Sequence, residues 1–350
     1  MKRIIALAVA AIALAALAAA LRPGASHADG GPINAKHFFW AAGTAQAAST
    51  QDDITNNLIY HGGNAGPGAI GVIQKPKMYL IYWGTQWAQG FTTADTDGKL
   101  YSSNQLINYI NSMAKGFGGS AYAGVQTQYC NNVMAGSTSC VGGSGFVTNP
   151  KNQFGGAWVD PSPVPDNIVT LGLAENLVDD PLAQEAVKAT GHFGYDPNGV
   201  YLIMTPPGTS GVGEQAVYCG YHTQTTALDG LGNQERVQYS FIPWQNTAVP
   251  ALGQECGLHA VNANSNNFGN GVFDSWSIVI GHEYSEAVTD PDNFFGVQDG
   301  WNDDQTSENG DKCAWTDLQN VTFGGHQFAM QPEWSNEAFD ATGNGCAFSR

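Results

Sequence analysis

Basic residues are scarce in this chain of 350 residues, which has 13 Lys and Arg against 30 Asp and Glu and a formal net charge of −17. A nucleic-acid binder needs a positively charged surface that neutralises phosphates, and an anionic membrane attracts the same residues. The composition therefore argues against nucleic acid and anionic membranes as partners. The acidic excess suits an exported protein and could supply ligands for hard metals, although a solvated acidic surface explains most of it.

Two motifs with chemical meaning are also missing. No Cys-x-x-Cys pair is present, which argues against a metal held by cysteines. The Gly208–Gly211 turn lacks the Gly-x-Ser-x-Gly form of a serine hydrolase, so it is interpreted as a loop.

The N-terminus has the features of a signal peptide. A basic start precedes an apolar run from Ile4 to Leu21, and Ser26-His27-Ala28 has the small-x-small form of a cleavage site. Residues 1–28 are therefore predicted to direct export to the periplasm or the exterior. A membrane anchor is the alternative, but the Ala-rich run and the cleavage site that follows it favour removal of the leader.

Six cysteines lie in the part that would be exported. An even count in an oxidising compartment predicts three disulfides, and spacing alone does not fix their pairing. We favour the pairs that close local loops, which are Cys130–Cys140, Cys219–Cys256 and Cys313–Cys346.

The pattern of apolar residues predicts one α/β domain with a mixed sheet, stabilised by disulfides. Asp29–Gly71 lacks periodicity and is predicted to be extended or partly ordered, and the folded domain is predicted to occupy residues 72–350. Short apolar runs bounded by Pro, Gly and Asn indicate strands. These runs are Met78–Trp83, Ile168–Leu173, Val200–Met204 and Val237–Ile242.

Three helices are expected between and after these strands. One begins at Ser102 or Ser103 and ends near Gly116, and another runs from Pro181 to about Thr190 before Gly191. The third begins at Asp274 or Ser275 and ends near Thr289, before Pro291. Helices that alternate with strands favour the α/β class over a sandwich.

The third helix carries the chemistry. Its first half is apolar enough to be buried, yet it then presents His282, Glu283 and Glu286, and unpaired burial of such groups is costly. His282 and Glu286 are four residues apart, so both project from one helical face as two ligands of one ion. This is the His-Glu-x-x-His arrangement of zinc peptidases with Glu in place of the second His. In that arrangement Glu283 takes a proton from water.

The segment His282–Asp290, His-Glu-Tyr-Ser-Glu-Ala-Val-Thr-Asp, resembles the active-site helix of gluzincins, the thermolysin-like metallopeptidases. That resemblance implies a third ligand about twenty residues downstream, for which Glu308 is the candidate. Asp311 is then an alternative ligand or an acceptor that orients His282, and Asp290 is a further candidate for these roles.

The replacement of the second His by Glu affects which metal ion is expected. One His and two carboxylates nearly neutralise a divalent ion and acidify water less than two His and one carboxylate would. Zinc is expected, with manganese or calcium as alternatives because the ligands are harder. The acidic stretch Asp290–Asp311 suits an additional calcium, although it lacks the spacing of an EF-hand and a solvated loop explains it equally well.

A wider set of landmarks runs from Leu58 to the end of the chain. It resembles the EXORDIUM-like, phosphate-induced protein family, whose plant members are associated with the cell wall and generally lack the His-Glu pair. This chain keeps the pair, which resembles the bacterial branch and suggests a hydrolase site. The landmarks are Leu58–Gly62, Met78–Gly84 with Trp87, Gly199–Leu202, Cys219–His222, Thr289–Pro291, Gln331–Asn336 and Cys346.

These observations together predict a secreted zinc metallopeptidase that acts on protein or peptide substrates. A non-catalytic protein that binds a cell-wall or extracellular component through a structural metal is the alternative, and a metal hydrolase of polysaccharide or ester is a third. His326 could stabilise an oxyanion, against a surface-loop histidine. His222 and Tyr221 could line the cleft, although a buried Tyr usually serves packing.

Overall fold

The computed structural model describes residues 37–44, 47, 54–63, 70–165, 181–209, 218–228, 231–245, 256–291 and 299–350, which all belong to one compact unit from Asn34 to Arg350. The predicted signal peptide and the predicted strand Ile168–Leu173 lie outside these ranges. Within them, no helix combines the length and the apolar character that crossing a membrane requires.

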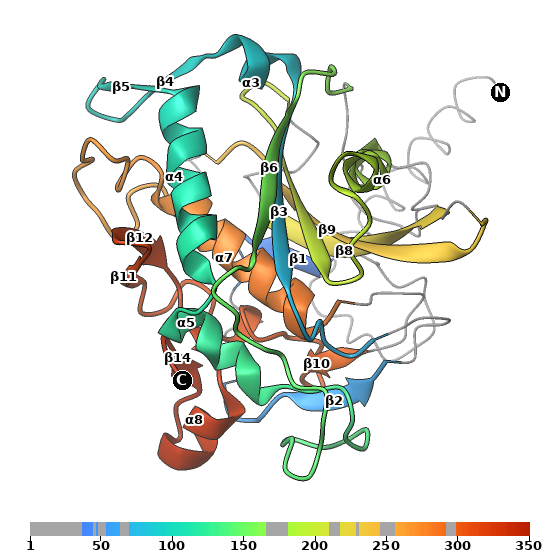
Figure 1. Ribbon diagram of the computed structural model, residues 1–350. Coiled ribbons are helices and arrows are strands. Elements are labelled where there is room, and N and C mark those ends of the chain that lie inside the picture. Colours follow the sequence, from blue (N-terminus) through green and yellow to red (C-terminus); the bar gives the residue numbers. More distant parts are fainter. Residues whose placement is uncertain are drawn as a thin grey trace, which may run out of the picture. The chain divides into compact units, whose positions relative to one another are not determined.

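A six-stranded mixed sheet forms the centre of this unit (Figure 1). Its order is β1-β8-β9-β7-β3-β6, with β9, β7, β3 and β6 parallel and with β8 and β1 each antiparallel to its inner neighbour. Three of the predicted strands are confirmed as β3, β7 and β9. The bounds are β1 (His37–Trp40), β3 (Lys77–Trp83), β6 (Phe154–Asp160), β7 (Gly199–Met204), β8 (Tyr218–Leu228) and β9 (Gln234–Ile242).

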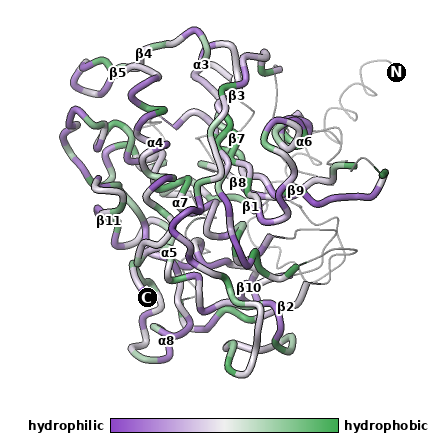
Figure 2. Tube along the Cα trace, viewed as in Figure 1, coloured by the Kyte–Doolittle hydropathy of each residue, from purple (hydrophilic) through white to green (hydrophobic). Residues whose placement is uncertain are grey.

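Helices cover both faces of the sheet, which is why β7 and all of β3 after Lys77 consist of buried, mostly apolar residues (Figure 2). Successive residues of a strand point to opposite faces. Along β3, Leu80 packs in the cluster that contains α4 and α7, and the next residue, Ile81, packs in the cluster that contains α6. The α7 helix thus lies directly against the sheet.

The three predicted helices are confirmed as α4 (Ser103–Phe117), α6 (Pro181–Phe193) and α7 (Asp274–Thr289). Ser102 caps α4 through a capping box with Gln105. The glycine expected to end α4 instead lies inside the helix, where a Cβ on Gly116 would stand 2.6 Å from the backbone nitrogen of Gly324. Likewise α6 passes the predicted stop at Gly191.

Smaller elements complete the described fold. A β2–β10 pair lies near one end of α7, and the β11–β12 hairpin packs against α7. The bounds are β2 (Ile59–Gly62), β4 (Thr92–Ala94), β5 (Leu100–Ser102), β10 (Gly300–Asn302), β11 (Gln319–Phe323), β12 (His326–Met330), β13 (Glu333–Trp334), β14 (Cys346–Ala347), α3 (Thr85–Gln89), α5 (Ala121–Gly124), α8 (Asn336–Thr342), and the 3₁₀ turns η1 (Val125–Gln128) and η3 (Asp311–Cys313).

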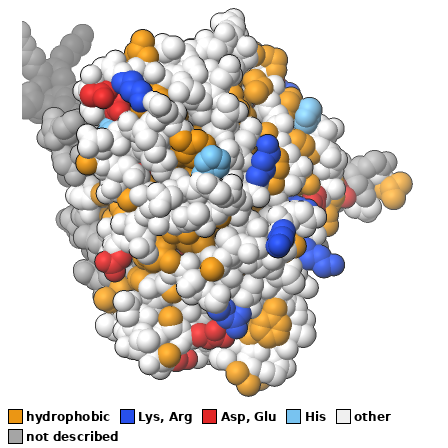
Figure 3. Space-filling model, turned by 60° about the vertical axis from the view of Figure 1, so that its left-hand side comes forward, with side chains coloured by type: hydrophobic (Ala, Val, Ile, Leu, Met, Phe, Trp, Pro, Cys, Tyr) orange, Lys and Arg blue, Asp and Glu red, His pale blue; other side chains and the backbone are white. Residues whose placement is uncertain are grey.

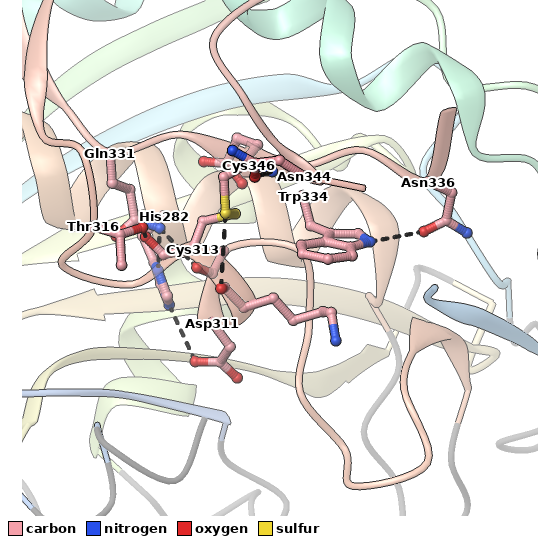
Figure 4. The surroundings of a disulfide bond; sticks show 12 residues. His282, Asp311, Cys313, Thr316, Gln331, Trp334, Asn336, Asn344 and Cys346 are labelled. Atoms are coloured by element: carbon pink, nitrogen blue, oxygen red, sulfur yellow. Dashed lines mark hydrogen bonds and ion pairs between the residues drawn. A yellow bond between two sulfur atoms is a disulfide. The ribbon is translucent and has the colours of Figure 1, made fainter. Parts of the chain in front are cut away.

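All three favoured disulfides are confirmed: Cys130–Cys140, Cys219–Cys256 and Cys313–Cys346. The second joins β8 to the segment before α7. The third joins η3 to β14 (Figure 4).

The segment predicted to be extended or partly ordered contains two strands. β1 pairs with β8 and β2 pairs with β10, so the ordered body begins before Val72. Its apolar residues are too few for a periodic signal, because a four-residue strand is recognisable only through its partner.

Candidate metal centre

The α7 helix is buried along its whole length, from Asp274 to Thr289. The carboxylate of Asp274 fixes its first turn by accepting backbone N–H groups from Gly271 and Asn262, each at 2.7 Å. Because every face of the helix contacts protein, His282 and Glu283 have no exposed surface and Glu286 is 1 % exposed. Ionisable groups buried to this degree need hydrogen-bond partners or groups of opposite charge.

His282 and Glu286 meet as their spacing predicts. Nε2 of His282 lies 3.0 Å from Oε2 of Glu286. The same nitrogen lies 3.9 Å from Oδ1 of Asp311 (Figure 4). Asp311 comes from η3, and its backbone N–H donates to Oε1 of Glu286 at 2.9 Å. These three side chains offer one ligand atom each within a single cluster, which we call the α7 triad (His282, Glu286, Asp311).

Glu308, the candidate third ligand, groups with His37 and His222 and not with the α7 triad, although its side chain also hydrogen-bonds Glu286. It is fully buried beside His222 and His37, with 3.4 Å between its Oε2 and Nε2 of His222. Nδ1 of His37 contacts Oε1 of Glu308. Asp311, the alternative candidate, is the third side chain beside His282 and Glu286, because η3 turns it back toward α7.

Glu283 is not a member of the α7 triad, but it forms an adjoining group of potential ligands with His222 and Glu286. Its Oε2 lies 3.3 Å from Nδ1 of His222, and its carboxylate accepts the backbone N–H of Phe39. This approach to the sheet needs a glycine opposite, since a Cβ on Gly220 would stand 2.7 Å from Oε1 of Glu283. Nδ1 of His222 also lies 3.6 Å from Oε2 of Glu286, so His222 contacts both glutamates of α7.

The pKa values of these side chains shift in the direction that favours their neutral forms. Burial raises the pKa of Glu286 to about 8, and burial together with the charges of Glu286 and Asp311 raises the pKa of Glu283 well above its usual range. Burial lowers the pKa of His282 to about 4. Burial, followed by the nearby imidazoles, lowers the pKa of His222. Without a compensating cation, these groups prefer their neutral forms.

The donor set fits a divalent metal ion. Nε2 of His282 is buried and makes no hydrogen bond, although carboxylate oxygens lie near it. One imidazole and two carboxylates suit zinc or manganese. Lys312, the buried cation nearby, is paired with Asp303 at 3.0 Å. The face of the molecule drawn in Figure 3 shows only scattered charged side chains. The acidic side chains of the α7 triad lie in the interior instead.

Neighbouring residues hold the His282 ring on three sides. Nδ1 lies 3.0 Å from the side-chain amide of Gln331, which also donates to the carbonyl of Gly310 at 2.9 Å. Gly310 lies so close that a Cβ there would stand 2.7 Å from Nδ1. Phe39 stacks on the ring with centroids 3.7 Å apart, and Trp315 stacks on Phe39.

Two predicted site residues lie elsewhere. His326 is exposed at the turn of the β11–β12 hairpin, where it stacks on Phe268, and this position does not fit an oxyanion role. Tyr221 points to the opposite face of β8 and packs on Phe38, so it does not line the centre.

The predicted calcium loop lies partly outside the described residues, which exclude 292–298. Asp290 caps α7 and accepts the side-chain amide of Asn302 at 2.8 Å. Asp303 pairs with Lys312, which makes it an internal ion pair instead of a solvated acid.

Sequence reasoning missed His37 and Phe39, which reach the centre from β1. Pairing with β8 places them there, and neither lies in a recognisable motif. Comparisons of the chain with models of protein families, with curated proteins and with solved structures found no match to any of them.

Proposed function

We propose that this chain is a secreted metal-dependent peptidase whose centre is the α7 triad with Glu283 as the general base. The observation that carries the proposal is the arrangement of the ionisable side chains on α7. His282 and Glu286 converge with Asp311, whereas Glu283, next to His282 in the sequence, is not part of this triad and contacts His222, which also approaches Glu286. A structural ion has no need of a second buried carboxylate beside its ligands.

His282, Glu286 and Asp311 would hold the ion, with zinc as the metal that their donors and the helix motif favour. A bound divalent cation would polarise the substrate carbonyl and make water a better nucleophile at neutral pH. The resemblance of His282–Asp290 to the gluzincin helix supports this assignment, and the EXORDIUM-like landmarks supply the family that we propose for the chain.

Glu283 is suited to proton transfer. Burial raises the pKa of Glu283 well above that of an ordinary glutamate, and a bound cation beside it would favour the ionised form that accepts a proton. It would accept the proton of the attacking water and deliver it to the leaving amine. His222 orients the carboxylate through the 3.3 Å contact at Oε2.

Complete burial of the α7 residues favours a second candidate. A structural ion inside a non-catalytic protein that binds a cell-wall or extracellular component tolerates a centre in which only Asp311, at 8 %, has more than a trace of exposed surface. Export is proposed for either candidate, because the predicted leader and the three disulfides both belong to an oxidising compartment.

The test combines metal content and cleavage on the purified mature protein. Elemental analysis is run beside hydrolysis of denatured casein, with and without a chelator and after zinc is added back. Bound zinc with cleavage that the chelator abolishes and zinc restores supports the peptidase. Bound zinc without cleavage supports the second candidate, and a chain that retains no divalent metal contradicts both.

A further inference from the structure

A second cluster of potential ligands lies beside the α7 triad. It consists of His37 from β1, His222 from β8 and Glu308 from the segment after β10, and we call it the β1 triad. Nε2 of His222 is 3.4 Å from Oε2 of Glu308, and Nδ1 of His37 contacts the other oxygen of the same carboxylate. Ligand atoms of a tetrahedral zinc ion lie about 3.3–3.5 Å apart when each is about 2.0–2.1 Å from the metal.

The imidazole of His222 lies between the β1 triad and the glutamates of α7. Nδ1 of His222 faces Glu283 at 3.3 Å and Glu286 at 3.6 Å, whereas Nε2 faces Glu308. Nε2 makes no hydrogen bond of regular geometry, although His222 is 1 % exposed. A buried ring nitrogen turned toward a carboxylate and a second imidazole is suited to ligate a cation.

Charge balance favours a cation there. Five buried carboxyl groups lie in or beside the two triads, and one divalent ion would offset only two of their charges. Lys312 pairs with Asp303. Burying ionised carboxylates without compensation is costly, so a second divalent ion would offset more of the set. The carboxyl groups are those of Glu283, Glu286, Asp290, Glu308 and Asp311.

We propose that His37, His222 and Glu308 form a second divalent-cation site, which fastens the N-terminal strand β1 to the metal centre. The proposal rests on the proposed centre and adds a second ion to it. A metal at Nε2 places the ring proton of His222 on Nδ1, where it donates to Glu283. The second ion therefore also orients the general base.

The site joins the N-terminal part of the chain to its core. β1 has only four residues, and Phe39 of this strand covers the ring of His282. The backbone ladder to β8 is short, with a register shift between Phe39 and Trp40. Ligation through His37 therefore supplies an attachment that a four-residue strand lacks on its own.

The experiment measures zinc stoichiometry on the full mature chain after removal of metal by chelation. Calorimetric titration with zinc, checked by elemental analysis after dialysis, is expected to give two equivalents for the unaltered chain. His37→Ala and Glu308→Gln are each expected to give one. His326→Ala is the matched control, because His326 is an exposed histidine away from both triads, and it is expected to keep two.

A second readout follows β1 itself. Hydrogen exchange of the β1 amides is expected to slow when zinc is added to the unaltered chain and to His326→Ala, and to stay fast in His37→Ala. A stoichiometry of one in the unaltered chain, or two in His37→Ala, would overturn the second site. His37→Asn, which keeps a polar side chain of similar size, repeats the test should alanine disturb β1.

The outcomes separate this inference from the proposed function. If the chain binds two zinc equivalents, one of which is lost in His37→Ala, but does not cleave casein, the second site is supported and the peptidase is contradicted. If the chain binds one zinc equivalent that depends on His282 and cleaves casein, the peptidase is supported and the second site is contradicted.

Discussion

His37 lies directly opposite His222 in the pairing of β1 with β8, with 5.1 Å between their ring centroids. Directly opposed residues of an antiparallel pair bring their side chains to the same face. The pairing thus carries an N-terminal histidine to the centre that α7 organises, and the chemistry of α7 depends on residues from both ends of the fold.

Substitution of Glu283 by Gln is expected to abolish casein cleavage while zinc binding at the α7 triad persists. The amide keeps the size of the side chain but cannot accept a proton, and loss of a general base costs about 10²–10⁴-fold in rate. Glu337→Gln is the matched control, because Glu337 is exposed and pairs with Arg350. Equal rates for the two variants would remove Glu283 from the mechanism.

Substitution of Gly310 by Ala is expected to weaken zinc binding and to destabilise the chain by about 1–3 kcal/mol through overpacking. The new Cβ would stand 2.7 Å from Nδ1 of His282 and 2.8 Å from Oε1 of Glu286, so one of these groups must move. Gly191→Ala is the control, because nothing lies within 4 Å of a Cβ there. Thermal unfolding with and without zinc measures both effects, and similar behaviour of the two variants would contradict the prediction.

Metal-free protein is expected to lose stability as the pH rises from about 6.5 to above 8. The pKa of folded Glu286 is about 8 against 4.5 for an ordinary glutamate, so its contribution is complete below pH 4.5 and is lost as the pH rises through 8. The pKa of His282 is lowered from 6.5 to about 4, so its contribution is lost only as the pH falls below 6.5.

Urea midpoints of the chelated protein across this pH range measure the effect. Zinc is expected to flatten the dependence, because the ion replaces the proton that Glu286 would otherwise bind. Glu286→Gln is expected to reduce the dependence without zinc, and the raised pKa values of Glu283, Glu308 and Asp311 account for what remains. A midpoint that rises between pH 6.5 and 8 would contradict the assignment.

Replacement of Cys313 and Cys346 by Ser is expected to cost about 2–5 kcal/mol of stability and to weaken zinc binding. This disulfide anchors η3, which presents Asp311 to His282 (Figure 4). The same replacement at Cys130 and Cys140 opens a shorter loop, so it is expected to cost less and to leave zinc affinity unchanged. Equal zinc affinities in the two double variants would show that η3 keeps its position without the bond.

The parts of the centre that the sequence predicts are those set by local geometry. His282 and Glu286 are one helical turn apart, and α7 fulfils that expectation because apolar residues bury the helix on all sides. The pairing of cysteines followed from loop closure. Asp311 and Glu308 are close in sequence, and spacing alone could not decide which would face α7.

The remaining parts depend on contacts between distant segments. His37 reaches the centre through strand pairing with β8, and nothing in its own neighbourhood indicates that partner. His326 follows the ligands in sequence, but the β11–β12 hairpin carries it to the surface. Reasoning from closeness in sequence therefore assigned His326 to the centre wrongly and missed His37.

The distance along the chain between His37 and Asp311 has a consequence for biosynthesis. His37 is made long before Asp311, so a chain that ends before Asp311 cannot assemble both triads. Binding of both proposed ions would therefore require that the segments from His37 to Asp311 are all present and correctly paired. Retained zinc would serve as a measure of folding quality in any preparation of this protein.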